Sequence, residues 1–299
     1  LGHHDTVFPV GTLARRPFAV TDATMTGPGV VDMKAGIVQA VHAVAALADA
    51  SGVEMLFTSD EEVGSTTSRV LVEERALACG NVLVLEPSAD GGAVKTGRKG
   101  TGTFEIVIRG RASHAGLEPE RCVNALIETA HQVLRIASFT DSAAGTAVTP
   151  TVAHVGTADN VVPAEARIRV DVRVTSAAEK ARVEAAMASL TPVDREATIE
   201  VTGAVTRPPM PESASATLLP LALAAAPGIG GVAVGGASDG NFTAAIGVPT
   251  LDGLGAVGGG AHADHEWVQV DTLPGRVELV RGILERLVWP PSSGSATMA

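Results

Sequence analysis

The sequence has few of the residues that several kinds of ligand require. It contains no tyrosine, and aromatic residues make up only 3% of its 299 positions. Because exposed bases and sugars stack on aromatic side chains, we expect the chain to bind neither of them by stacking. Lys and Arg number 22 against 33 Asp and Glu, which leaves a formal net charge of -11. Since a nucleic-acid backbone is bound by clustered cations, the composition predicts no nucleic-acid partner.

Long apolar runs and a cysteine framework are also missing. No uncharged apolar run reaches the roughly 18 residues that span a bilayer, so we expect no membrane partner. The two cysteines, Cys79 and Cys122, lack a metal-type spacing and are too few for a disulfide framework. We expect both thiols to be buried, as free cysteines usually are.

The chain starts with Leu1 in place of Met, and its first motif begins at Gly2. We therefore expect a fragment or a processed chain, from which any signal peptide has been lost. A cytoplasmic location is the first expectation, and secretion is the alternative.

The hydrophobic pattern at both ends of the chain predicts an α/β domain. Residues 34–50 repeat apolar positions near the helical period of about 3.6, and residues 65–78 form a second predicted helix. Short apolar runs at 53–58 and 81–85 are typical of buried strands. Beyond residue 204 we expect helices at 216–226 and 268–288, strands at 232–234 and 248–251, and a frayed tail at 290–299. Alternating strands and helices predict a mostly parallel sheet with helices on both faces.

The middle of the chain has a different pattern. Apolar and polar residues alternate at 103–108 and 165–174, and residues 197–201 form a further predicted strand. Amphipathic helices are predicted at 122–137 and 177–190. Half-exposed strands of this kind favour an antiparallel sheet with helices on one face, which is an α+β domain. We place this domain as an insertion at 97–203, so that residues 1–96 and 204–299 form one discontinuous domain.

Acidic residues and histidines gather at five places in the outer segments. These are His3 with Asp5, Asp32 before a helix, Glu61 with Glu62 after a strand, Glu86 after a strand, and His262 after three glycines. In open α/β sheets, ligands collect beyond the carboxyl ends of the strands. Each place also has an ordinary explanation, namely a polar surface loop, a helix N-cap or a solvated turn. Considered together, the five places favour a binding site.

The residue types at these places suit a metal centre. Two histidines and several carboxylates are typical ligands of zinc, with manganese and cobalt as alternatives. If Asp32 bridges two ions and each ion has two further ligands, the result is a two-metal site. The adjacent Glu61 and Glu62 point in different directions, so one can bind a metal while the other holds a water molecule.

Eight stretches carry a resemblance to a known family. They are GHHDTV, GPGVVDMKAG, TSDEEVGS, VLEPS, GRASHAG, NVVP, DVRV and GGGAHADHEWV, and they cover nearly the whole chain in family order. The chain resembles the zinc metallopeptidase and amidohydrolase family of bacterial glutamate carboxypeptidase, acetylornithine deacetylase, succinyl-diaminopimelate desuccinylase and aminoacylase. Within that family it most resembles the glutamate carboxypeptidase branch. The resemblance implies a phosphorylase/hydrolase-like zinc peptidase domain and an inserted ferredoxin-like lid domain that forms a homodimer.

The resemblance also implies roles for the metal-site residues. His3, Asp32 and Glu86 would bind one of two zinc ions. Asp32, Glu62 and His262 would bind the other. Asp5 would orient His3, and Glu61 would be the general base.

The inserted domain contributes further candidates by resemblance. His114 in GRASHAG resembles the histidine that reaches into the partner subunit's active site and polarises the scissile carbonyl; a histidine at the start of a turn is the alternative. Asn160 and Arg207 resemble groups that hold the substrate carboxylate, and a free surface arginine is the alternative for Arg207. Arg173 lies on an alternating strand and is naturally solvent-facing.

These parts predict a metal-dependent hydrolase of amide bonds. A zinc-activated water, with Glu61 as its base, would attack an amide carbonyl polarised by His114. Arg207 would select a product with a carboxylate, because arginine pairs a carboxylate with two hydrogen bonds. We expect release of a C-terminal amino acid, with glutamate as one candidate, from a small peptide or an N-acyl amino acid.

Three alternatives stay open. The first is an N-acyl amino acid deacylase similar to acetylornithine deacetylase. The second is a serine hydrolase, because Gly236-Ala-Ser238-Asp-Gly240 fits a nucleophile elbow and Asp252 and His262 follow in order. The third is a binding module or an inactive remnant.

The third alternative rests on the first motif. The resembling family normally has a further stretch before it, which supplies the strand that carries His3. We therefore hypothesise that this chain binds metal weakly or folds poorly. Calorimetric zinc titration tests this hypothesis, and tight binding of two equivalents would contradict it.

Overall fold

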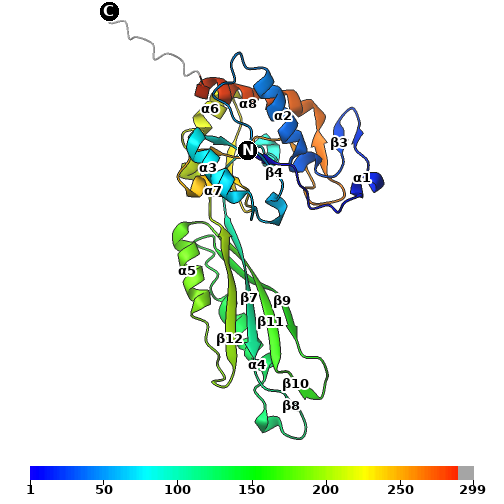
Figure 1. Cartoon of the computed structure of the whole chain (residues 1–299), viewed down its shortest axis with the longest axis vertical. Helices are drawn as coiled ribbons and strands as arrows, with labels where there is room; N and C mark the ends of the chain where they lie inside the picture. Colours follow the sequence, from blue (N-terminus) through cyan, green and yellow to red (C-terminus); the bar gives the residue numbers. More distant parts are fainter. Residues whose placement is uncertain (289–299) are drawn as a thin grey trace, which may run out of the picture. The chain divides into compact units, whose positions relative to one another are not determined.

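The chain divides into two compact units. The computed structural model describes residues 1–288, so the tail predicted at 290–299 lies outside the described residues. Unit 1 comprises Leu1–Arg98, Met210–Val234 and the residues from Ser238 onward, and unit 2 comprises Lys99–Pro209 with Gly235–Ala237 (Figure 1). The sequence analysis placed the second boundary at residue 203. In the structure, one strand continues to Arg207 before the chain returns to unit 1.

Six short strands form the central row of unit 1. They form three two-stranded sheets, and the contacts between these sheets give the order β4 (Phe57–Thr58), β1 (Gly2–His3), β5 (Val82–Leu83), β14 (Thr250–Leu251), β6 (Val94–Arg98) and β13 (Gly231–Val234). The pairs β1–β4, β5–β14 and β6–β13 are parallel. The N–H of Leu85 donates to the carbonyl of Leu1 and links β1 to β5, and a single antiparallel bridge between Lys95 and Asp252 links β6 to β14. The predicted, mostly parallel sheet is confirmed.

Helices cover both faces of this row. One face packs against α2 (Ala35–Ala45), α6 (Leu219–Ala225) and α8 (Leu273–Val288), and the other against α3 (Arg69–Cys79) and α7 (Gly240–Ala245). Side chains on β5 and in the two residues after it alternate accordingly. Leu85 joins the core with α2 and α8, whereas Val82 and Val84 join the core with Ala76 of α3. None of the helices that the structure describes is long and apolar enough to cross a bilayer.

A second sheet in unit 1 was not predicted. It is antiparallel, in the order β15 (Gly258–Gly259), β16 (Trp267–Gln269), β3 (Thr24–Thr26) and β2 (Ala19–Val20), and the short helix α1 (Thr12–Arg15) precedes it in the chain. The helix predicted at 268–288 was wrong at its start. Val268 pairs with Met25 and packs on Val30 and Val31, and α8 begins only at Leu273. Pro274 suits the first turn of that helix, because it lacks an N–H.

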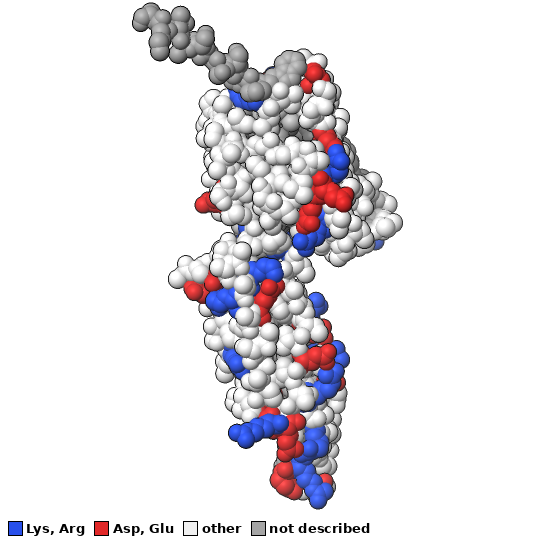
Figure 2. Space-filling view, turned by 60° about the vertical axis from the view of Figure 1, so that its left-hand side comes forward, with Lys and Arg blue, Asp and Glu red and all other residues white. Residues whose placement is uncertain are grey.

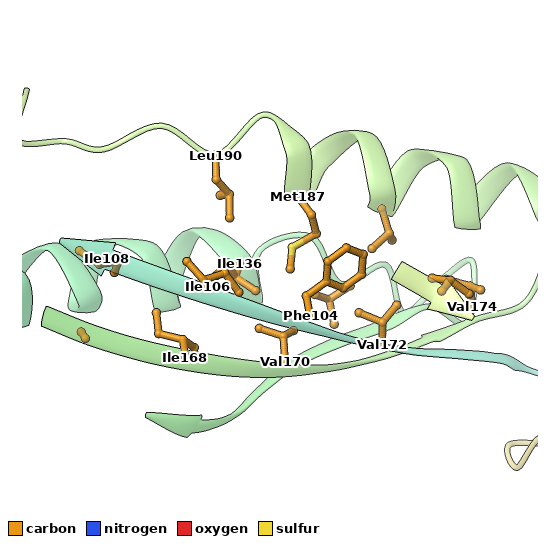
Figure 3. Close-up of a cluster of buried hydrophobic side chains, with 14 of the residues drawn as sticks. Phe104, Ile106, Ile108, Ile136, Ile168, Val170, Val172, Val174, Met187 and Leu190 are labelled. Atoms are coloured by element: carbon orange, nitrogen blue, oxygen red, sulfur yellow. The ribbon is translucent and has the colours of Figure 1, made fainter. Parts of the chain in front are cut away.

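Unit 2 is a four-stranded antiparallel sheet with helices on one face. The strand order is β12 (Thr198–Arg207), β7 (Gly100–Arg109), β11 (Glu165–Val174) and β9 (Ala147–Val155), and the helices are α4 (Ala125–Ala137) and α5 (Ala177–Ala188). Figure 3 shows Phe104, Ile106, Val170 and Val172 on the sheet face that meets Met187 of α5. The predicted α+β fold of the insertion is confirmed. Strand β9 was missed, because most of its side chains are exposed and carry no alternating apolar pattern.

The outer face of the unit 2 sheet carries charged pairs. Arg167 lies 3.1 Å from Glu105, and Arg109 lies 2.9 Å from Glu200 on neighbouring strands. Figure 2 shows side chains of both signs interspersed on the surface of this unit. Exposed pairs of this kind contribute at most about 1 kcal/mol each. The buried face of the sheet therefore holds the unit together.

The prediction that both cysteines are buried was wrong. Cys79 is exposed and Cys122 is half-buried, so neither is a core thiol. Cys79 is the last residue of α3, directly before the left-handed Gly80. Helix α4 begins after Asn124, whose side chain accepts hydrogen bonds from two N–H groups of the first turn, and Cys122 therefore precedes the helix.

Candidate metal centre

His3 lies on β1 in the middle of the unit 1 sheet. The strand is held to β4, because the N–H groups of Gly2 and His4 each donate to carbonyl groups 3.0 Å away. The His3 ring is buried, with Nε2 lying 3.2 Å from Asp32 Oδ1 and 3.5 Å from Glu86 Oε1. Its Nδ1 lies 3.1 Å from the carbonyl oxygen of Asp5 and 3.4 Å from the Asp5 carboxylate. Asp5 is therefore placed to orient this ring.

His262, from the C-terminal part of the chain, lies against the other oxygen of the Asp32 carboxylate. It follows the left-handed Gly260 and itself has a φ of 66°. Its Nε2 lies 3.3 Å from Asp32 Oδ2 and 3.2 Å from Glu62 Oε2. The two oxygens of Asp32 therefore face different histidines. One group is His3, Asp32 and Glu86, and the other is His262, Asp32 and Glu62, which are the two sets that the resemblance implied.

A helical turn, Glu61–Val63, places the two glutamates after β4. The Asp5 carboxylate accepts a hydrogen bond of 3.0 Å from the N–H of Glu62 and so fixes the turn beside His3. Asp60, before the turn, accepts hydrogen bonds of 2.8 Å and 2.6 Å from Thr67. Glu61 is half-buried and close enough to raise the pKa of His3. The turn thus presents Glu62 to His262 and keeps Glu61 at the same cluster.

Glu86 borders a buried ion pair that the sequence analysis did not identify. Arg98 donates to both oxygens of Asp252, at 2.6 Å and 2.9 Å, and lies 3.7 Å from Glu86 Oε2. Ser238 is fully buried and donates to Asp252 at 2.6 Å. The serine-hydrolase alternative is therefore wrong, because the Ser238 hydroxyl is inaccessible and bonds to a carboxylate that Arg98 neutralises. His262 faces Asp32 and Glu62 instead.

The electrostatics of the cluster fit cations. Burial lowers the pKa of His3, but hydrogen bonds with Asp32 and Glu86 outweigh it and raise this pKa to about 11. Burial raises the pKa of Glu62, and repulsion from Asp32 raises it further. Among the described residues, Glu62 Oε1 and Asp5 Oδ1 are buried without a hydrogen-bond partner. Crowded carboxylates and two imidazoles are the donor set that divalent zinc takes, so the residues present fit such ions.

Two candidates of unit 2 lie together, and the third does not. His114 on β8 (Ser113–His114) pairs with Val161 of β10 (Val161–Val162), and the carbonyl of the adjacent Asn160 accepts a hydrogen bond of 3.0 Å from Ala115. Both candidate side chains are exposed. Arg207 is buried at the last position of β12, beside Thr101 of β7. Thr101 stands near the start of β7, whereas β8 follows the end of β7, so Arg207 lies at the opposite end of the sheet from β8. Figure 1 shows β8 and β10 together beyond that far end.

Sequence reasoning gave no role to Glu266, although it stands in the same motif as His262. Its carboxylate is buried and accepts hydrogen bonds from the N–H groups of Gly29, Val31 and Asp32. An acidic residue in a turn is usually solvated, so the sequence carried no signal for this contact.

Arg173 forms hydrogen bonds with Asp171 at 2.9 Å and 3.0 Å, on the outer face of its strand.

Comparison with known proteins agrees with this geometry. Residues 1–286 match the family described as Peptidase family M20/M25/M40. Carboxypeptidase G2 of Pseudomonas sp. (strain RS-16) is 33% identical over 302 aligned residues, which cover 95% of this chain and 72% of the relative. Succinyl-diaminopimelate desuccinylase of Gluconacetobacter diazotrophicus is 30% identical over 321 aligned residues, covering 96% of this chain and 80% of the relative.

The fold is also similar to that of solved structures. Aminopeptidase PepT from Bacillus cereus ATCC 10987 superposes with a TM-score of 0.77 at 23% identity, covering 96% of this chain and 79% of that protein. This likeness bears on the fold alone. The family match covers nearly the whole chain, and it agrees with the two groups of side chains around Asp32. The chain therefore belongs to peptidase family M20/M25/M40, a family of metal-dependent amide hydrolases that typically use zinc.

Proposed function

We propose that this chain is a two-zinc carboxypeptidase-type hydrolase, which releases a C-terminal amino acid from a small peptide or an N-acyl amino acid. The observation that carries the proposal is the Asp32 carboxylate, whose two oxygens face His3 and His262 at 3.2 Å and 3.3 Å. A single carboxylate between two histidines suits a pair of metal ions. Manganese and cobalt are alternatives for the same donors. The identity to a carboxypeptidase over 95% of the chain supports the class of substrate.

Glu61 is the group that moves the proton in this proposal. Zinc, when bound, supplies an electrophile for the substrate carbonyl and lowers the pKa of the attacking water. Glu61 accepts the proton of that water and returns it to the leaving amine nitrogen. In the neighbouring Glu62, Oε2 lies 3.2 Å from Nε2 of His262. Glu61 is therefore the carboxylate of this turn that is left for proton transfer.

The candidates of unit 2 bind the substrate in this proposal. Arg207 and Asn160 hold the carboxylate of the released amino acid, and His114 donates a hydrogen bond to the carbonyl oxygen as negative charge develops there. Arg207 pairs with Thr101 near the start of β7, and β8 follows Arg109 at the end of β7. At about 3.4 Å per residue, Thr101 and Arg109 are roughly 27 Å apart along the strand. Arg207 and His114 of one chain are therefore too far apart for one small substrate.

A homodimer through unit 2 resolves this separation. Strand β9 has β11 as its one neighbour among the described strands, so its other edge is open for pairing. On α4, Leu126, Ile127 and Leu134 expose 51%, 58% and 73% of their surfaces. Exposed apolar side chains gathered on one helix suit a protein interface. In such a dimer, the partner's His114 and the partner's Asn160 serve the site that contains Arg207.

Metal removal and a substrate panel test the proposed activity. We expect the chain to hydrolyse peptides and N-acyl conjugates with a free C-terminal carboxylate, to lose all activity in EDTA, and to regain it with zinc. The panel varies the C-terminal residue, with glutamate among those tested, and includes N-acetylornithine. Preference for acetylornithine over C-terminal peptide bonds would establish the deacylase alternative. Activity that survives EDTA would refute a metal-dependent mechanism.

Mixed dimers test whether His114 acts on the partner's site. Glu61→Gln and His114→Ala are each expected to be almost inactive alone. When the two variants are mixed and allowed to exchange subunits, a mixed dimer has one site with intact Glu61 and intact His114. Random assortment makes about half of the dimers mixed, so about a quarter of wild-type activity should return. If mixing restores no activity in dimers proven to exchange, His114 does not act across the interface.

A further inference from the structure

Glu266 is a buried carboxylate that accepts hydrogen bonds from the main chain around Asp32, a candidate metal ligand. It is 1% exposed and stands between the His262 turn and β16. Its Oε2 accepts a hydrogen bond of 2.7 Å from the N–H of Gly29, and its Oε1 accepts bonds of 2.8 Å and 3.0 Å from Val31 and Asp32. One of these donors is the N–H of Asp32 itself. The position of the shared ligand is therefore set by a residue from the His262 segment.

Arg16 extends this contact to the segment that follows His3. Its guanidinium stacks on Phe8, 4.3 Å from the ring centre. One nitrogen donates to the Ala263 carbonyl at 3.2 Å and to Asp264 at 3.0 Å, and the other lies 3.7 Å from Glu266 Oε2. Three segments that carry metal-ligand candidates, after His3, around Asp32 and after His262, thus meet at Glu266.

Burying a carboxylate is costly unless it is hydrogen-bonded and paired with a cation. Glu266 satisfies both requirements with groups that all belong to ligand-bearing segments. His262 depends on this anchor more than His3 does. Its side chain is 54% exposed on a turn, whereas the His3 side chain is 2% exposed on a strand that is hydrogen-bonded on both sides.

We propose that Glu266 is a positioning residue for the metal centre, and that it acts chiefly on the half-site formed by His262, Asp32 and Glu62. The proposal rests on the proposed two-metal site. Glu266 fixes the Asp32 main chain and the base of the His262 turn, so that both ligands face one ion. The competing explanation is that Glu266 stabilises the fold without affecting either ion.

Zinc titration of Glu266→Gln separates these explanations. The glutamine side chain has nearly the same shape but directs its NH₂ group toward backbone donors, and it no longer attracts Arg16. We expect wild type to bind two equivalents. In Glu266→Gln, one equivalent should bind about 10–100-fold more weakly, as happens when partners of metal ligands are changed, while the other is less affected. Glu278→Gln, at an exposed position of α8, is the matched control and should match wild type.

The absorption spectrum of the Co²⁺-loaded protein supplies a readout that a change in stability alone would not move, because it depends on ligand geometry. We expect a changed spectrum for the weaker equivalent in Glu266→Gln. If Glu266→Gln does not fold, Arg16→Met serves as the second variant. It keeps an apolar side chain against Phe8, removes the charge next to Glu266, and should weaken the same equivalent; Arg281→Met is its surface control.

Each outcome has a distinct meaning. Two equivalents of unchanged affinity, with an unchanged Co²⁺ spectrum, in whichever of the two variants folds would overturn the positioning role of Glu266. Failure of the wild-type chain to bind two equivalents would count against the proposed two-metal function instead. The same wild-type titration tests the expectation of weak metal binding.

Discussion

Unit 1 collects its candidate metal-site residues from segments far apart in the sequence, whereas unit 2 is one nearly continuous segment that carries His114 and Asn160 at one end. The strands of the central row of unit 1 are two to five residues long, and three strands of unit 2 are ten residues long. Short strands end early, and the loops that follow can turn their side chains toward one place. Long strands with one apolar face build a stable support instead.

The polar contacts of the two units differ in the same way. In unit 1, buried carboxylates accept hydrogen bonds from distant segments, as Glu266 does from Asp32 and Asp252 does from Arg98. In unit 2, charged pairs lie on the exposed sheet face between neighbouring strands. The difference teaches that unit 1 uses buried polar groups to position a candidate site, while unit 2 relies mainly on apolar packing, with the buried Glu128 accepting hydrogen bonds from the N–H groups of Val193 and Asp194. Two substitutions, one in each unit, test whether chemistry and stability separate as cleanly as this comparison suggests.

Glu61→Gln should have the larger effect. If Glu61 transfers the proton, the substitution should lower kcat by about 10²–10⁴-fold, because glutamine cannot accept a proton. Zinc affinity and the unfolding midpoint should stay close to wild type, since Glu62 and His262 keep their contact at 3.2 Å. Steady-state kinetics, calorimetric zinc titration and thermal unfolding measure the three quantities.

Glu285→Gln on the exposed face of α8 is a matched control for this experiment. The comparison would break if Glu61→Gln kept more than a tenth of the wild-type kcat, because the base would then lie elsewhere. It would also break if zinc affinity fell as steeply as kcat, since Glu61 would then be a ligand.

Unit 2 was the part of the fold that the sequence predicted well, for a local reason. On β11 the apolar residues Ile168, Val170 and Val172 alternate with charged ones, and this period directly gives the buried face. Strand β9 escaped prediction because its neighbour β11 satisfies its backbone while its side chains remain mostly exposed. A strand that depends on backbone pairing leaves little trace in the hydrophobic pattern.

The candidate metal-site residues were predictable as a set, and the residues that support them were not. His3, Asp32 and His262 stand in motifs whose order along the chain carries the resemblance. Glu266 and Arg98 act on partners more than 150 residues away, at 234 and 154 positions of separation. No periodicity or local spacing records such a contact, so the structure was needed to find them.

Ile168→Val should have the smaller effect and should fall on stability. Ile168 is fully buried in the unit 2 core, and loss of one methylene there costs about 0.5–1.5 kcal/mol. Lys99–Pro209 contains no tryptophan, and Trp267 lies on β16 of unit 1. In urea titrations, the fluorescence change of Trp267 therefore reports on unit 1, whereas far-UV circular dichroism reports on both units.

If the units unfold independently, Ile168→Val should shift the circular dichroism transition and leave the fluorescence transition and zinc affinity unchanged. Ile283→Val is the reciprocal variant, because Ile283 is fully buried on α8 in the unit 1 core. It should shift the fluorescence transition. Should both variants shift both transitions equally, the chain unfolds as one cooperative body. The apolar core of unit 2 would then contribute to the stability of the metal centre as well as to its own.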